Sequence, residues 1–174
     1  MILFTIGHST RSLEGFLALL REAGVAGIAD VRRFPFSRRH PQFNGEALAA
    51  SLAAAGIAYR HFPALGGRRA ATAESPHTLW REPGFRNYAD YAETAPFKEA
   101  FAALRRLAAE RPTAVMCAEA VWWRCHRRII ADYLIAAGDE VRHILDGKIE
   151  PASLTPDATV RPDGTILYRA PSLF

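Results

Sequence analysis

Two cysteines bracket the part of this sequence that is best equipped for chemistry. Cys117 ends an apolar run, and Cys125 follows after a short loop, directly before His126 and Arg127. A thiol near cationic groups loses its proton more readily, and the thiolate is the nucleophilic form. We therefore predict that Cys117, Cys125 and His126 are catalytic, together with Glu119. Arg127 is predicted to bind an anion in bidentate fashion.

Other interpretations of the same residues stay open. Either cysteine could be a small buried apolar residue, and His126 could be a core histidine. The two thiols could also form a redox pair or bind zinc or iron. However, their spacing is not C-x₂-C and the chain has no second cysteine pair, so we predict no metal site and no cofactor. A metal-dependent hydrolase remains a lesser alternative.

Further polar residues follow two other apolar runs. His8 and Ser9 come after the first run, and Asp30 and Arg32 come at the end of the second. We predict that His8 transfers protons and that Ser9, Asp30 and Arg32 bind ligand. Ser9 could instead cap a helix, and Asp30 could form a structural salt bridge with an arginine.

Two adjacent glycines add a weaker signal. Gly66 and Gly67 precede two arginines inside the long irregular stretch from Pro63 to Pro83. Because glycine lets backbone approach a ligand closely, we also predict that this pair lies at the binding site.

Hydrophobic periodicity indicates alternating strands and helices. The expected strands are Ile2–Ile6, Ala26–Val31, Ile57–Arg60, Pro112–Cys117 and Val141–Leu145. The expected helices are Leu13–Gly24, Glu46–Ala55, Phe85–Glu93, Pro96–Ala108 and Arg124–Ala137. This alternation predicts an α/β fold of three layers, with a mostly parallel sheet of about five strands flanked by helices.

We expect a single domain over residues 1–174, with its core in residues 1–145. In the tail, residues 146–174, a turn signature at Arg161–Thr165 predicts a small C-terminal hairpin. Ligands of open α/β sheets bind outside the carboxyl ends of the strands. His8, Asp30 and Cys117 should therefore share one edge of the sheet. In this scheme Cys125 lies in the first turn of a helix, where the helix dipole favours an anion.

Composition limits the classes of protein to consider. The chain is 49% hydrophobic, which suits a globular protein, and its longest apolar run is too short to span a membrane. The N-terminus lacks the basic region of a signal peptide, and two cysteines imply no disulfide framework. We therefore expect a cytoplasmic protein with no membrane partner.

The net charge of +4 is explained either by solubility or by an anionic partner. Much of this charge lies between Arg32 and His40, where arginines alternate with Phe34 and Phe36. Basic residues interleaved with aromatic ones suit phosphate binding and base stacking, although a solvated basic loop has the same composition. A nucleic-acid partner is therefore possible, and Trp122 with Trp123 could stack on a ring or merely pack the loop.

Five short motifs together resemble the DUF488 family of bacterial proteins, and the similarity extends from the first strand to about Ile144. The motifs are Thr5–Ser9, Asp30–Arg32, Leu65–Gly67, Tyr88–Tyr91, and Cys117–Glu119 with Cys125–Arg127. The family has no settled biochemical function, so the resemblance supports the choice of site residues and not an activity.

We expect an enzyme that acts on a phosphorylated or otherwise anionic small molecule or nucleotide. The alternative is a nucleic-acid-binding or accessory module without catalysis. The sequence leaves the oligomeric state open.

Overall fold

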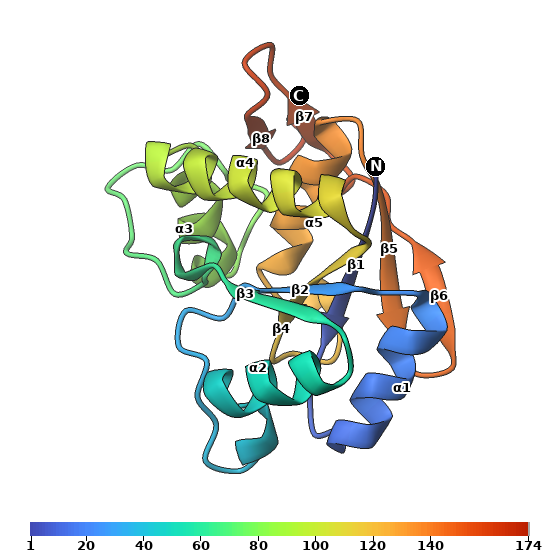
Figure 1. Cartoon of the computed structure of the whole chain (residues 1–174). Helices are drawn as coiled ribbons and strands as arrows, with labels where there is room; N and C mark the ends of the chain where they lie inside the picture. The colour runs from blue at the N-terminus through green and yellow to red at the C-terminus, as the bar shows by residue number, and fades with distance from the viewer. Residues whose placement is uncertain (174) are drawn as a thin grey trace.

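The central sheet has six strands, and five of them run parallel, as the alternation of strands and helices predicts. The computed structural model describes residues 1–173 (Figure 1). The strand order is β3-β2-β4-β1-β5-β6. The strands are β1 (Ile2–Gly7), β2 (Gly27–Asp30), β3 (Ala58–His61), β4 (Thr113–Cys117), β5 (Glu140–Leu145) and β6 (Lys148–Pro151).

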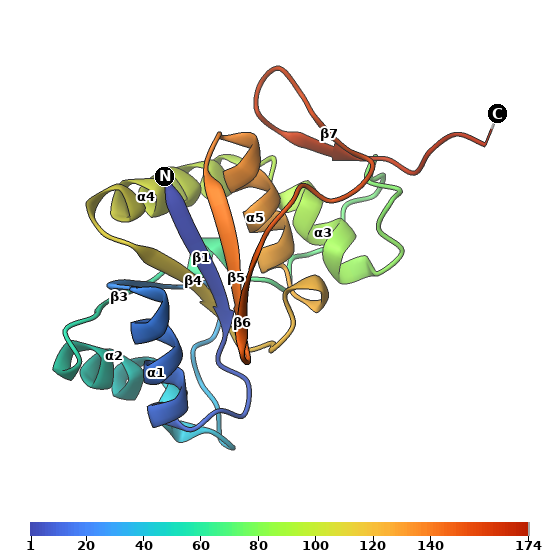
Figure 2. The ribbon, with the colours of Figure 1, turned by 90° about the vertical axis from the view of Figure 1, so that its right-hand side faces the viewer.

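Helices cover both faces of this sheet and complete the predicted three layers. The helices are α1 (Leu13–Ala23), α2 (Gly45–Ala54), α3 (Pro83–Tyr91), α4 (Ala95–Glu110) and α5 (Arg127–Ala136). Figures 1 and 2 show α1 and α2 on one face and α3, α4 and α5 on the other. Two separate apolar cores result, one on each face. Within the described residues, no helix combines the length and apolar character needed to cross a membrane.

The chain leaves β1 and β4 toward opposite faces of the sheet. These strands are neighbours and parallel. After β1 the chain enters α1, whereas after β4 it enters α5 on the other face (Figure 2). Such a reversal between adjacent parallel strands is the place where α/β sheets commonly bind ligands. The carboxyl ends of β1 and β4 are Gly7 and Cys117, and they are paired in register.

The C-terminal tail contains the predicted hairpin and one strand that we did not predict. The hairpin consists of β7 (Ala158–Val160) and β8 (Ile166–Tyr168). The buried Tyr168 donates a hydrogen bond to Asp132 of α5 over 2.7 Å, which fastens the hairpin to the core. The unpredicted strand is β6, which runs antiparallel to β5 at the edge of the sheet.

One predicted helix boundary is wrong in a way that affects the site. α5 begins at Arg127 and not at Arg124, because Trp122–Arg124 form a short 3-10 turn. Cys125 follows this turn with an extended backbone, at φ −128° and ψ 147°. It therefore lies just before the helix and not in its first turn.

Candidate functional site

The two cysteines contact each other through their sulfur atoms. Cys117 ends β4, and the loop after it returns so that the Sγ atoms of Cys117 and Cys125 lie 2.7 Å apart. Both are free thiols, and they are 2% and 5% exposed. The prediction that both sulfurs lie at one sheet edge is confirmed.

Arg127 reaches back from the first residue of α5 to the end of β4. Its Nη1 lies 2.7 Å from Cys117 Sγ and donates to the carbonyl oxygen of Glu119, also at 2.7 Å. Its Nη2 donates to the carbonyl of Ala120, whereas its buried Nε has no hydrogen-bond partner among the described residues. The residue is only 1% exposed. Within residues 1–173 this guanidinium forms no ion pair with a carboxylate, which is unusual for a buried arginine.

Gly7 makes this arrangement possible. A Cβ atom at this position would lie 1.6 Å from the carbonyl oxygen of Glu119 and 2.9 Å from Arg127 Nη1. The amides of His8 and Ser9 donate to the carbonyls of Cys117 and Ala118, respectively. These bonds extend the β1–β4 pairing past the strand ends. We did not predict this role of Gly7, although a glycine ending an apolar strand beside a polar motif was the available signal.

The environments of the two thiols differ. Burial opposes ionisation of Cys117, but hydrogen bonding from Cys125 and the positive charge of Arg127 lower the pKa of Cys117 below its usual value. For Cys125, burial and the neighbouring Cys117 raise the pKa well above its usual value. We had predicted a lowered pKa for Cys125 because we placed it in the first turn of a helix. That placement is wrong, and so is the predicted direction of the shift. Cys117 is therefore the thiol that favours the thiolate form.

His126 is held beside Cys125 in a neutral state. Its Nε2 lies 3.0 Å from the carbonyl of Val31, so Nε2 carries the proton and donates it. The bare Nδ1 then faces Cys125 Sγ at 3.5 Å. Burial lowers the pKa of His126 to about 4. A Cβ on Gly67 would lie 3.1 Å from this ring, so the glycine allows the loop to pass close to it.

A second buried cluster lies at the ends of β1 and β2. Asp30 accepts two hydrogen bonds from the Arg32 side chain, at 2.9 and 2.7 Å, and a third from the Tyr59 hydroxyl at 2.6 Å. The remaining Nη1 of Arg32 lies 3.2 Å from His8 Nε2. The interpretation of Asp30 as the partner of an arginine is confirmed.

His8 has no contact with the hydroxyl of Ser9. Its Nδ1 donates to the Ser9 carbonyl oxygen at 2.9 Å, and its ring stacks on Phe43 with centroids 4.4 Å apart. Burial lowers the pKa of His8 to about 4. The predicted serine–histidine pair for nucleophilic catalysis is therefore not formed, and the other ring nitrogen of His8 already faces Arg32.

Two other predicted site residues are placed differently from what we expected. The carboxylate of Glu119 belongs to an exposed residue, and only its backbone carbonyl contacts Arg127. Gly66 packs against the backbone of Arg33, where a Cβ would lie 2.6 Å from the Arg33 Cα. Within residues 1–173, no three His, Cys, Asp or Glu side chains are grouped so as to hold a metal ion.

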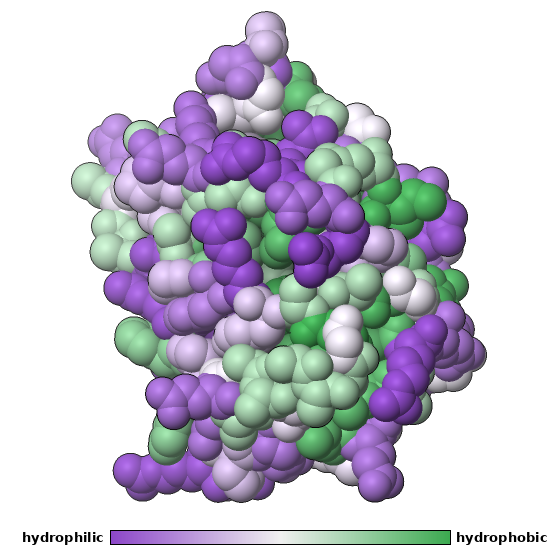
Figure 3. All heavy atoms as spheres, in the orientation of Figure 1, coloured by the Kyte–Doolittle hydropathy of each residue, from purple (hydrophilic) through white to green (hydrophobic). Residues whose placement is uncertain are grey.

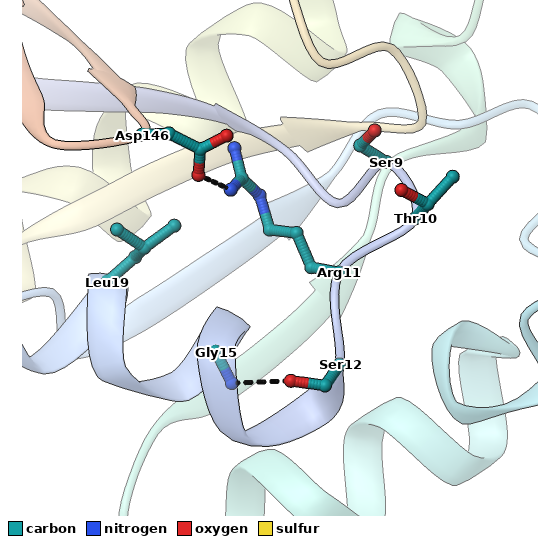
Figure 4. Close-up of a pocket in the computed structure, with 7 residues that line it drawn as sticks. All are labelled: Ser9, Thr10, Arg11, Ser12, Gly15, Leu19 and Asp146. Carbon is teal, nitrogen blue, oxygen red and sulfur yellow. Dashed lines mark hydrogen bonds and ion pairs between the residues drawn. The ribbon is translucent and has the colours of Figure 1, made fainter.

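A hollow of about 400 Å³ lies beside this site, at the ends of β1 and β5. It is lined by Ser9 and by residues that we did not predict, notably Arg11 and Asp146, which form an ion pair across it (Figure 4). The side chain of Ser12 caps α1 at its other border by accepting from the Gly15 amide at 3.0 Å. Charged residues in loops gave no periodic signal from which this hollow could be predicted.

Comparison with known proteins yields a family but no activity. No curated protein and no solved structure matches this chain. The model of the domain of unknown function DUF488 matches residues 12–134, which include both cysteines, Arg127 and the Asp30–Arg32 pair. His8 and Ser9 precede the matched segment. Since this match covers most of the sequence, the chain belongs to the DUF488 family.

Proposed function

We propose that this protein is an enzyme that uses the Cys117 thiolate to act on a phosphorylated or otherwise anionic small molecule or nucleotide. The observation that carries the proposal is the contact between Cys117 Sγ and the buried guanidinium of Arg127. A buried positive charge without a counter-ion is costly. A thiolate at Cys117 would supply the missing negative charge, because its sulfur lies 2.7 Å from Arg127 Nη1.

Cys125 and His126 have different proposed roles beside the Cys117 sulfur. Cys125 keeps its proton and donates it to Cys117, which stabilises the thiolate. His126 presents its bare Nδ1 to Cys125 and can accept the proton of that thiol. In the proposed step the Cys117 thiolate displaces a leaving group from the substrate, so the new bond to sulfur replaces the bond to that group. Cys125 is placed to give its proton to the departing group, with His126 beside it.

In this proposal the anion is bound by residues other than Arg32 and Arg127, which we first expected to bind it. Arg32 is neutralised by Asp30, and Arg127 is occupied by Cys117 and two carbonyls. Exposed arginines occur on three loops of this edge. Arg124 directly precedes Cys125, and the loops of Arg33 and Arg68 meet through a 2.5 Å bond from Arg33 Nη1 to the Arg68 carbonyl. Their positive charge supports an anionic substrate.

Burial restricts what can reach the sulfur. Cys117 is 2% exposed, and in the loop that follows β4 the carbonyl oxygen of Glu119 lies 3.8 Å from its sulfur. Access requires a small reactive group or a shift of this loop. We therefore expect small electrophiles to react with Cys117 much faster than bulky ones do.

Alkylation kinetics test the proposal. In Cys125→Ser, iodoacetamide should modify Cys117 at neutral pH at least about tenfold faster than it modifies Cys125 in the matched Cys117→Ser variant. The Cys117 rate should fall when Arg127 is replaced by glutamine, with thermal unfolding confirming that this variant is folded. Equal rates for the two thiols, or a Cys117 rate that does not respond to Arg127→Gln, would contradict a reactive thiolate.

A further inference from the structure

Two phenylalanine rings project from the loop between β2 and α2. Phe34 and Phe36 are 65% and 67% exposed, whereas Phe16, Phe43 and Phe97 are fully buried. Exposed aromatic rings close together on a surface commonly mark a binding site. Neither ring contributes to the thiol site or to a core.

This loop is held in a defined shape. The amide of Phe36 donates to the carbonyl of Phe34 at 2.8 Å, and the amide of Ser37 donates to the Asn44 side chain at 2.6 Å. The amide of Gly45 donates to the Pro35 carbonyl at 2.8 Å, which ties the loop to the start of α2. The rings are therefore presented by a braced loop, which lowers the entropy cost of binding a ligand.

Positive charge surrounds the two rings. The loop carries three exposed arginines, a fourth lies on the adjacent loop after β3, and no acidic residue occurs between positions 31 and 45. Figure 3 shows hydrophilic and apolar side chains interleaved at the lower left, over the loop that follows β2. We call this the basic–aromatic surface: Arg33, Phe34, Phe36, Arg38, Arg39 and Arg68.

The two loops form one continuous surface. Arg33 donates to the carbonyl of Arg68, and Gly66 packs directly on the Arg33 backbone. The guanidinium of Arg33 also lies 5.6 Å from the centre of the Phe34 ring. The basic–aromatic surface therefore interleaves arginines with the exposed rings of Phe34 and Phe36.

We infer that the basic–aromatic surface binds single-stranded nucleic acid. Guanidinium groups bind backbone phosphates, while exposed rings stack on bases irrespective of sequence. A duplex keeps its bases stacked internally and offers none to the rings. An acidic peptide would satisfy the arginines but leave Phe34 and Phe36 without partners. This inference does not depend on the reactivity of Cys117.

Fluorescence anisotropy of the full chain with labelled single strands of about 15 nucleotides, oligo(dT) and oligo(U), tests it. Phe34→Ala/Phe36→Ala should weaken binding by about tenfold or more, since each lost stack contributes substantially. Arg38→Ala/Arg39→Ala should weaken it as well. The control Lys98→Ala/Arg106→Ala removes the same charge from exposed positions on α4, across the sheet, and should change affinity less than about twofold.

Salt dependence provides the second readout. Four phosphate contacts on a single strand predict that affinity falls roughly 50-fold between about 50 and about 200 mM salt. Thermal unfolding should be unchanged in all three double variants, because the substituted side chains are exposed. The inference is overturned if neither oligonucleotide binds at about 50 mM salt. Equal losses in the phenylalanine and control variants, or equally tight binding of a duplex or of polyglutamate, overturn it too.

Discussion

Arg32 and Arg127 are both buried at the carboxyl edge of the sheet, yet they are compensated in different ways. Arg32 is 7% exposed and forms a bidentate pair with Asp30, itself fully buried. Arg127 is 1% exposed and meets a cysteine sulfur and two backbone carbonyls.

The difference lies in how permanent the counter-charge is. The counter-charge of Arg32 is a carboxylate, held in place by two hydrogen bonds from the guanidinium. The counter-charge of Arg127 exists only while Cys117 is a thiolate. Protonation, oxidation or alkylation of that sulfur removes it. The Asp30–Arg32 pair therefore suits a structural role at the sheet edge. The charge balance at Arg127 instead changes with the chemical state of the Cys117 sulfur.

Removing the permanent charge should have the largest effect. Asp30→Asn leaves Arg32 buried without a counter-ion, and we expect a loss of about 3–5 kcal/mol in the free energy of unfolding, measured by urea denaturation. The control Glu99→Gln neutralises an exposed carboxylate on α4 and should change stability by less than about 0.5 kcal/mol. A loss below about 1 kcal/mol for Asp30→Asn would contradict the structural role of the pair.

Acid should destabilise both clusters through their histidines. His8 and His126 have pKa values lowered to about 4, against about 6.5 when exposed. Between these values the unfolded chain binds protons that the folded chain does not, so stability is full above about pH 6.5 and is lost as pH falls towards 4. For His126 the loss corresponds to roughly 3 kcal/mol.

The matched variants separate this effect from general acid denaturation. Urea titrations at about pH 7 and about pH 4.5 should show a smaller acid-induced loss for His126→Gln than for the parent chain. His40→Gln, on a partly exposed loop, serves as the control and should keep the parental loss. If the parent and His126→Gln lose the same stability, the neutral buried histidine is not a source of acid sensitivity.

The sequence predicted the sheet because its signals are local. Apolar runs separated by helical periodicity gave five strands and five helices, and strand ends placed His8, Asp30 and Cys117 at one edge. The edge strand β6 was missed because Lys148–Pro151 contains two charges and a proline and lacks alternation.

The roles within the site were not predictable in the same way. Which thiol has the lowered pKa depends on Arg127, which reaches from α5 to β4 past Gly7, and on the 3-10 turn that sets the position of Cys125. Both are tertiary contacts with no periodic pattern. The neutralisation of Arg32 by Asp30 was easier to anticipate, because the two residues are close in sequence.

The stability of the protein at alkaline pH tests whether the charge of Arg127 is balanced by a Cys117 thiolate. A lowered pKa for Cys117 contributes stability above the unfolded pKa of about 8.5, and this contribution is lost as pH falls through the folded value. The raised pKa of Cys125 acts in the opposite direction, because the folded thiol keeps a proton that the unfolded one releases. The two thiols therefore oppose each other above about pH 8.5.

Serine variants resolve the two contributions. Cys117→Ser should cost about 2 kcal/mol near pH 9 and less near pH 6, in urea titrations at both values. Cys125→Ser retains a hydrogen-bond donor and should instead lessen the alkaline loss of stability. An effect of Cys117→Ser that is independent of pH would show that Arg127 does not depend on a thiolate.

The smallest expected effect concerns Tyr59, which supports the permanent cluster from β3. Its hydroxyl donates to Asp30 Oδ2 at 2.6 Å, and that oxygen also accepts from Arg32. In Tyr59→Phe the carboxylate keeps both Arg32 bonds, so we expect a loss of about 1 kcal/mol in the free energy of unfolding. The loss should disappear when Asp30→Asn is already present, since the two residues share one network. A double-mutant cycle in urea measures this coupling, and strict additivity would mean that Tyr59 stabilises β3 by packing and not through the carboxylate.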